Sequence, residues 1–138
     1  MKIVIADKMP KQSAEIRRKV FVEEQGFQSE FDGADEIATH FLAMEGETAV
    51  ATCRVYFNEE KSAFVIGRFA VQKEFRGKNV GTFIVDSVAD FIKKKGAKTL
   101  LVKAQVRAVP FYKKVGFVPF GEVEEDEGIP HIWMQKDL

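Results

Sequence analysis

Apolar residues recur along this chain with two periods, one typical of strands and one typical of helices. An alternating, β-branched run opens the sequence at 2–7, and a nearly continuous apolar run at 62–71 is typical of a central strand. Apolar side chains three and four positions apart indicate amphipathic helices instead. The pattern predicts strands at 2–7, 40–44, 48–57, 62–71, 99–104, 117–123 and 131–136, and helices at 10–25, 80–95 and 109–115.

Short polar segments separate these elements and indicate how they connect. The turns at 45–47 and 58–61 are short enough to close hairpins, and Gly96 and Gly116 are placed to end helices. The acidic stretch at 26–38 has no clear period and is predicted as a long loop with room for one helical turn. Strands come first and then alternate with helices, which predicts an α/β fold with a mixed sheet covered by helices.

The composition is that of a folded protein with balanced charge. Its 138 residues fit one domain, residues 1–138, and 46% are hydrophobic and 30% charged. The 21 basic and 21 acidic side chains cancel, so no global charge favours nucleic acid or an anionic membrane. Cys53 is the single cysteine, and neither a leader-like start nor an apolar run of about 20 residues is present. We therefore expect a cytoplasmic protein without nucleic-acid or membrane partners.

A basic, glycine-containing segment, residues 76–81 (RGKNVG), lies between a predicted strand and a predicted amphipathic helix. The first turn of a helix has unpaired backbone N–H groups that can hold a phosphate, and glycine lets the backbone approach the anion closely. Arg76 and Lys78 add positive charge at the same place. The spacing matches neither the Walker pattern nor the dinucleotide glycine pattern. A solvated basic turn is the plainer alternative, so this segment alone leaves both interpretations open.

A second segment, residues 108–117 (AVPFYKKVGF), combines a predicted short helix with aromatic residues. Gly116 would end the helix, and the aromatic side chains could pack beneath it as they do in many folds. Together the two segments resemble the GNAT acyltransferase superfamily, whose acyl-CoA motif reads (Q/R)xxGx(G/A) and whose second motif reads FYxxxGF. Arg76 and Gly81 match the ends of the first motif, and Asn79 stands where glycine is usual. One helix and one strand separate the two motifs, as in that family.

The resemblance covers nearly the whole chain and implies a fold. It implies a three-layer α/β/α GNAT fold, in which a mixed central sheet is splayed between strands 4 and 5. Further segments are similar to a small bacterial branch described as predicted acetyltransferases, namely 17–25 (RRKVFVEEQ), 66–71 (IGRFAV) and 128–134 (GIPHIWM). Where that branch has a histidine before an Ala-Gln pair, this chain has Lys103.

The resemblance also implies a cosubstrate, acetyl-CoA, and the residues that bind it. Backbone amides of the loop would hold the pyrophosphate, and amides of the central strand at 69–71 would stabilise the developing oxyanion. Tyr112 matches the family's general acid, a role suited to a phenol with an ordinary pKa of about 10. A core aromatic residue with a satisfied hydroxyl is the alternative for Tyr112. The implied cosubstrate-binding residues are Phe69, Ala70, Val71, Arg76, Gly77, Lys78, Asn79, Val80, Gly81, Thr82, Gln105 and Phe111.

No single residue stands out as the base that would accept the amine proton, and a chain of water molecules could replace a dedicated base. If the acidic stretch lines the acceptor cleft, its charge favours a cationic amine, and otherwise it is a solvated surface. Arg54 and Arg68 lie in strand patterns and need charged partners. The two histidines lack metal-ligand spacing, so no metal is expected. The candidates for the base or the acceptor pocket are Glu30, Asp32, Asp35, His40, Glu125 and His131.

These inferences converge on an acetyl-CoA-dependent N-acyltransferase that moves an acetyl group directly to an amine. Small amines, amino acids, aminoglycosides, peptide amino termini and lysine side chains are all open as acceptors. A non-catalytic CoA-binding sensor or interaction domain on the same scaffold is the alternative from another class, because a fold does not determine a function. The basic residues at 93–95 motivate a nucleic-acid-binding module only weakly. The fold is compatible with a homodimer.

Overall fold

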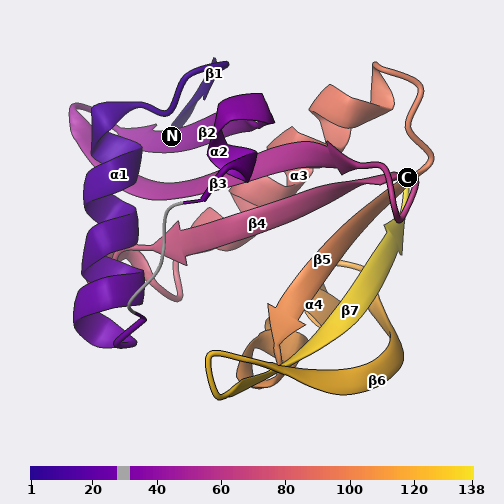
Figure 1. Ribbon diagram of the computed structural model, residues 1–138. Helices are drawn as coiled ribbons and strands as arrows, with labels where there is room; N and C mark the ends of the chain where they lie inside the picture. Colours follow the sequence, from indigo (N-terminus) through magenta and orange to yellow (C-terminus); the bar gives the residue numbers. More distant parts are fainter. Residues whose placement is uncertain (28–31) are drawn as a thin grey trace.

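The computed structural model describes residues 1–27 and 32–138, and within them one mixed sheet is flanked by helices (Figure 1). The strands are β1 (Lys2–Ala6), β2 (Thr39–Glu45), β3 (Thr48–Asn58), β4 (Ala63–Val71), β5 (Thr99–Gln105), β6 (Val118–Asp126) and β7 (Ile129–Asp137). The α-helices are α1 (Lys11–Arg17), α2 (Ala34–Ile37), α3 (Val80–Lys93) and α4 (Val109–Lys114). A π-helical segment, η1 (Arg18–Glu24), continues α1, and short 3₁₀ turns are η2 (Lys73–Phe75) and η3 (Val106–Ala108).

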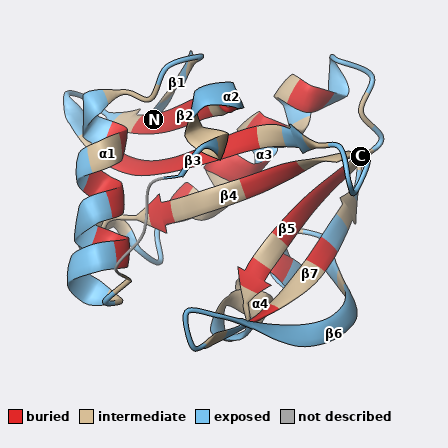
Figure 2. Ribbon diagram, viewed as in Figure 1, coloured by how far each residue is buried: buried red, intermediate tan, exposed pale blue. Residues whose placement is uncertain are grey.

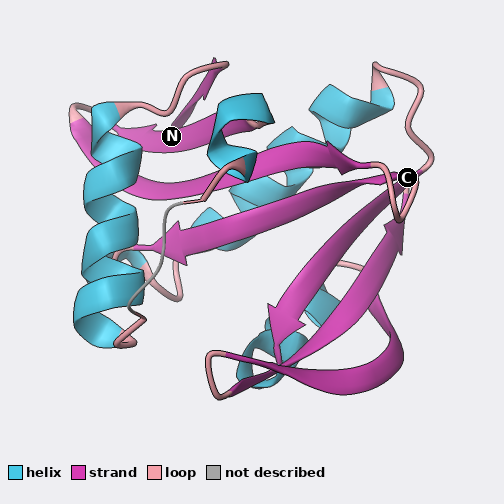
Figure 3. Ribbon diagram, in the orientation of Figure 1, coloured by secondary structure: helices cyan, strands magenta, loops and turns pink. Residues whose placement is uncertain are grey.

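The strand order in the sheet is β1-β2-β3-β4-β5-β7-β6, and the distribution of strands and helices is shown in Figure 3. Every neighbouring pair is antiparallel except β4 and β5, which run parallel. A parallel connection needs a crossover, and α3 supplies it between these two strands. The predicted α/β class and the mixed sheet are therefore confirmed.

The sheet opens between β4 and β5, as the family resemblance implies. Their pairing covers only Phe64–Ile66 of β4 against Leu100–Val102 of β5, whereas β4 continues to Val71 beside β3. Figure 1 shows the two strands diverging from this short contact. On β4, Arg68 and its successor lie opposite the single residue Cys53, and Arg68 has a φ of 48°. This β-bulge bends the strand away from β5 and holds a non-glycine residue in a left-handed conformation.

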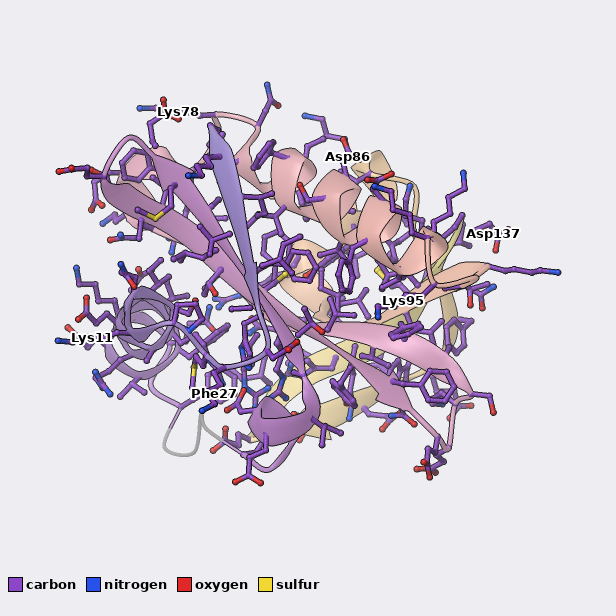
Figure 4. The ribbon with its side chains drawn as sticks, turned by 90° about the horizontal axis from the view of Figure 1, so that it is seen from above. Lys11, Phe27, Lys78, Asp86, Lys95 and Asp137 are labelled. Atoms are coloured by element: carbon purple, nitrogen blue, oxygen red, sulfur yellow. The ribbon has the colours of Figure 1, made fainter. Side chains whose placement is uncertain are left out.

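Helices cover both faces of the sheet. The apolar face of α3 packs with β3, β4 and β5 into the larger core, and α4 adds Tyr112 to it. On the other face, Ile16, Val20 and Phe21 pack against Leu42 and Ala70. Figure 4 shows α1, marked by Lys11, and α3, marked by Asp86, on opposite sides of the strands. In Figure 2 the central strands carry most of the buried residues, and β6 at the edge is largely exposed.

The predicted elements are confirmed to within a few residues at their ends, with one difference in kind. The helix predicted at 10–25 begins at Lys11 and changes to π-helical geometry from Arg18 onward. Its apolar spacing suits an α-helix equally well, so nothing in the sequence indicates the wider turns. Wider turns of this type are found frequently at functional sites. The acidic loop contains the short helix α2, which accounts for the single helical turn allowed there.

Candidate active site

A cavity of about 560 Å³ lies where the end of β4 meets the start of α3, and we call it the loop cavity. Residues of η1, η2 and α4 complete its wall. The predicted cosubstrate residues in its lining are Phe69, Ala70, Val71, Arg76, Gly77, Asn79, Val80, Gly81, Thr82 and Phe111.

The start of α3 supplies the loop cavity with backbone donors. Asn79 adopts a left-handed conformation, with φ 62° and ψ 16°, and turns the chain into the helix. The first hydrogen bond of the helix runs from Phe83 N–H to the Asn79 carbonyl over 3.1 Å. The N–H groups of Val80, Gly81 and Thr82 precede this bond, so the helix offers them no acceptor. Asparagine tolerates this conformation better than most residues, which explains how it can stand where the family usually has glycine.

Gly81 allows a side chain of α4 to approach the helix closely. A Cβ at this position would lie 2.8 Å from Cζ and 2.9 Å from Cε1 of Phe111. Real Cβ atoms essentially never come so close, so any larger residue must displace the Phe111 ring. Both residues line the loop cavity, and the second glycine of the motif is therefore required for its shape.

The two basic side chains of the loop have different surroundings. Arg76 Nε donates to the Val71 carbonyl over 2.9 Å, and its guanidinium lies 3.0 Å from Glu24 Oε2 at the end of η1. This ion pair joins η1 to the loop, a contact the sequence did not indicate. The Lys78 ammonium lies 5.8 Å from the Phe75 ring centre and does not line the cavity, so its role toward the cosubstrate stays a prediction. Figure 4 shows it at the periphery of the molecule.

A second cavity of about 470 Å³ lies between the diverging parts of β4 and β5. We call it the hairpin cavity because the β6–β7 hairpin forms one wall. The β4 bulge, β5 and the end of η1 form the other walls. Gln105 lines this cavity and not the loop cavity, so its contact with the cosubstrate stays a prediction. Its Nε2 donates to Gln25 Oε1 over 2.8 Å and so connects β5 to the residue that follows η1.

The two cavities meet, and Tyr112 lies at their junction. The residues that line both are Gln25, Phe69, Arg107, Ala108 and Tyr112. The Tyr112 side chain is 6% exposed and packs edge-on against Phe69, Phe111 and Phe117, with ring centres 5.1 to 6.3 Å apart. Burial, with a smaller contribution from Cys53, raises the pKa of the Tyr112 phenol well above its usual value. The phenol therefore keeps its proton throughout the neutral pH range.

His131 is the one predicted base candidate in the described part of the chain that lines a cavity together with Tyr112. It is 7% exposed, and its Nδ1 lies 2.8 Å from the Ile129 carbonyl oxygen. A carbonyl oxygen only accepts hydrogen bonds, so Nδ1 carries the proton of the neutral ring. Nε2 then has a free lone pair that can accept a proton.

The other candidates for the base lie elsewhere. His40 is 1% exposed, its Nε2 lies 3.0 Å from the Asp35 carbonyl oxygen, and it lines neither cavity. His40 therefore packs between β2 and the acidic segment, and the predicted role of His40 as a base in the site is wrong. Glu125 is exposed on β6 and lines neither cavity, whereas its neighbours Asp126 and Glu127 line the hairpin cavity. Glu30 lies outside the described residues.

Asp32 and Asp35 form a network of ion pairs with three arginines. Arg17 donates to both oxygens of Asp35 over 2.8 and 3.0 Å, and Arg54 Nη1 also donates to Asp35 over 2.9 Å. Arg54 donates to both oxygens of Asp32, which also accepts from Arg68 over 3.2 Å. The Arg17 and Arg54 side chains are only 2% and 5% exposed. The expected charged partners of Arg54 and Arg68 are therefore present, and the Asp35 side chain is largely buried, whereas that of Asp32 is 43% exposed.

The network lowers the pKa values of its two carboxyl groups. Burial alone would raise the pKa of Asp35, but hydrogen bonds from Arg17 and Arg54 lower it to about 2. The hydrogen bond from Arg54 also lowers the pKa of Asp32, against the opposing effect of burial. Both carboxylates therefore stay ionised at neutral pH, and neither is poised to accept a proton from a substrate amine.

Comparison with known proteins identifies the family. Residues 5–138 match the family model described as an acetyltransferase (GNAT) domain. The chain belongs to the GNAT acetyltransferase family. It is 34% identical to the uncharacterized N-acetyltransferase YjcF of Bacillus subtilis, over 99% of this chain and 100% of that protein. It is 31% identical to the protein ElaA of Escherichia coli, over 90% of this chain and 84% of ElaA.

Solved structures of this family have the same fold. The crystal structure of Escherichia coli ElaA superposes with a TM-score of 0.86 at 27% identity, over 98% of both chains. An aminoglycoside 6'-N-acetyltransferase complexed with coenzyme A superposes with a TM-score of 0.78 at 15% identity, over 99% of this chain and 97% of that one. At this low identity, the similarity to the aminoglycoside acetyltransferase shows only that the two proteins share a fold. The resemblance inferred from the two motifs is confirmed, and with it the GNAT fold.

Some residues of the two cavities were not indicated by the sequence. Glu24, Arg107 and Lys114 add charged groups to the loop cavity, and Phe21 and Phe27 line the hairpin cavity. Among the described residues, no group of three or more His, Cys, Asp or Glu side chains is placed to hold a metal ion. In the same part of the chain, no helix is both long and apolar enough to cross a bilayer.

Proposed function

We propose that this GNAT protein transfers an acetyl group from acetyl-CoA directly to a primary amine, with the chain of 1–138 acting as one catalytic domain. The meeting of the two cavities at Tyr112 is the observation that carries the proposal. The loop cavity takes the cosubstrate, and the hairpin cavity takes the acceptor. The acyl carbon and the amine then come together beside one buried, protonated phenol.

The loop cavity fits the phosphates and the pantetheine arm of acetyl-CoA. The unpaired N–H groups at the start of α3 suit a pyrophosphate, and Gly81 leaves room for close approach. Gln72 N–H donates to the Val50 carbonyl on β3, so by strand alternation Val71 N–H points into the opening of the sheet. We assign Val71 N–H to the pantetheine and the thioester oxygen, because the N–H of the adjacent Ala70 points back toward β3 by the same alternation.

Acetyl-CoA supplies an activated thioester, and the residues of this chain move the protons. The nitrogen lone pair of the acceptor attacks the thioester carbonyl, a C–N bond forms, and the C–S bond breaks. His131 Nε2 accepts the amine proton, directly or through water, and Tyr112 donates its hydroxyl proton to the leaving sulfur. Proton exchange with solvent then restores both groups.

Binding of acetyl-CoA is the first test of this proposal. In isothermal titration we expect micromolar affinity for acetyl-CoA and CoA and none for ATP, which lacks the pantetheine arm. Release of CoA thiol on addition of primary amines then tests transfer. Binding without transfer to any amine would favour a CoA-binding sensor, and absence of binding to both CoA species would refute the proposed cosubstrate site.

Replacing Gly81 by alanine tests the shape of the loop cavity. The added Cβ would lie 2.8 Å from Phe111 and push its ring into the cavity. We expect acetyl-CoA to bind about ten-fold more weakly, a loss of roughly 1.4 kcal/mol, in the same titration. Gly33→Ala is the matched control, because a Cβ there meets nothing within 4 Å. Equal affinity of Gly81→Ala and the wild type would mean that the cosubstrate does not use this helix terminus.

A further inference from the structure

The hairpin cavity is lined by charges of both signs that differ in their depth. Arg68 on the β4 bulge and Lys103 on β5 are half-buried, with side chains 30% and 32% exposed. Asp126 and Glu127 lie at the tip of the β6–β7 hairpin and are exposed. Two cations therefore lie on the strand walls, whereas the carboxylates at the hairpin tip and a third cation, Arg107 of η3, are exposed.

Depth decides which of these charges acts more strongly on a bound molecule. Solvent and salt screen charges at an exposed rim, whereas a half-buried charge acts through a medium of lower dielectric constant. The aspartates expected to make this site acidic, Asp32 and Asp35, accept hydrogen bonds from arginines. Lys103 has a weak contact, since its Nζ lies 3.5 Å from Glu124, whose side chain is 53% exposed. A pair with one largely exposed partner adds little stability, and Lys103 can exchange Glu124 for another anion.

Lys103 and Tyr112 line the same cavity, and β5 indicates how they are arranged. Lys103 precedes Gln105 by two residues on β5, so both side chains lie on one face of the strand, about 7 Å apart along it. Gln105 hydrogen-bonds to Gln25, one of the residues at the junction of the two cavities. An acceptor that extends from the junction toward Lys103 thus has its amine beside Tyr112 and its other end beside a cation.

We propose that the acceptor is a small primary amine that carries an anionic group, and that Lys103 binds this group. An amino carboxylate is the simplest such molecule, and the cavity of about 470 Å³ is large enough for one. This inference rests on the proposed acyl transfer to an amine, and it names the acceptor class for the same site. Lys103 then determines specificity, and Tyr112 and His131 carry out the proton transfers.

Matched acceptors test the inference. The ω-amino acids with one to five methylene groups are compared with the corresponding ω-amino amides and ω-aminoalkylphosphonates, by the rate of CoA thiol release from acetyl-CoA. We expect kcat/KM to be at least ten-fold higher for the amino acid than for its amide at the best chain length. Lys103→Met should lower this ratio about ten-fold, mainly through KM, because a charge-assisted contact is lost. A phosphonate that exceeds the carboxylate would identify phosphate-like groups as the anion.

Two further variants complete the design. Glu124→Gln removes the competing carboxylate and should raise the preference for the amino acid over the amide. Lys94→Met is the matched control, since Lys94 is also paired with a carboxylate, Asp90 at 3.3 Å, but lines neither cavity. Amides that react as well as amino acids, with a ratio unchanged by Lys103→Met, would overturn the acceptor class and leave acyl transfer intact. Failure of every amine to react, with acetyl-CoA bound, would instead overturn the proposed function.

Discussion

Replacing Tyr112 by phenylalanine should lower kcat for acetyl transfer at least 100-fold and leave acetyl-CoA affinity nearly unchanged. The variant loses only the hydroxyl group, and the ring keeps its edge-on contacts with Phe69, Phe111 and Phe117. General acid catalysis by a positioned side chain typically contributes a factor of about 100 to 10,000. The measurement is steady-state release of CoA thiol, together with titration of acetyl-CoA binding.

The pH dependence of the wild-type rate offers a second readout of the same role. Because burial raises the pKa of Tyr112, its acidic form persists to higher pH than that of an exposed tyrosine. The phenol should therefore cause no loss of kcat on the alkaline side up to its ordinary pKa of about 10.

The other tyrosine of the chain provides the control for this prediction. Tyr56 lies on β3, lines neither cavity and has Arg54 over its ring at 5.6 Å. Tyr56→Phe removes the same hydroxyl group and should keep kcat within about two-fold of the wild type, as expected of substitutions away from the site. If Tyr112→Phe retained full turnover, Tyr112 would be only a core aromatic residue, and the leaving sulfur would take its proton from water.

The order of elements could be predicted from local sequence patterns, whereas the loop segment alone left a phosphate site and a solvated turn both open. Apolar periodicity identifies the strands and α3, and the motif at 76–81 identifies a helix terminus suited to phosphate. These features depend on residues close in sequence. The opening between β4 and β5 came from the family resemblance, because no pattern in either strand shows that their pairing ends at Ile66 and Val102.

Contacts between distant segments could not be predicted in this way. Arg76 pairs with Glu24 from η1, and Gln105 hydrogen-bonds to Gln25, yet neither pair leaves a local signal. The sequence likewise does not indicate the π-helical geometry of η1, whose Val20 and Phe21 pack on the sheet. The charge of the acidic stretch gave no local sign of its partners, because the arginines that pair with Asp32 and Asp35 come from distant segments. The sequence did show arginines within predicted strands, and these indicated that acidic residues such as Asp32 and Asp35 would form ion pairs with arginine.

Replacing Arg54 by methionine should lower the free energy of unfolding by about 3 kcal/mol, because two carboxylates lose a buried partner. Arg54 bridges Asp32 and Asp35, and its side chain is 5% exposed. Methionine has a similar length and no charge, so the variant tests the ion pairs with little change in volume. Urea unfolding at pH 7 measures the effect. Lys94→Met removes an exposed ion pair and should change the free energy of unfolding by less than about 0.5 kcal/mol.

Acid titration of stability separates a loss of ion pairs from a loss of packing. The folded pKa of Asp35 is about 2, against 3.8 for an unperturbed carboxyl group, so its contribution of roughly 2 kcal/mol is present above pH 3.8. That contribution is lost as the pH falls through 2, where Asp35 becomes protonated in both states. In Arg54→Met the folded pKa should rise, because one of the two hydrogen-bonding arginines is gone, and stability should fall less steeply between pH 4 and 2. A variant that loses stability equally at pH 7 and pH 2 would show that Arg54 acts through packing, and that the ion pairs contribute little.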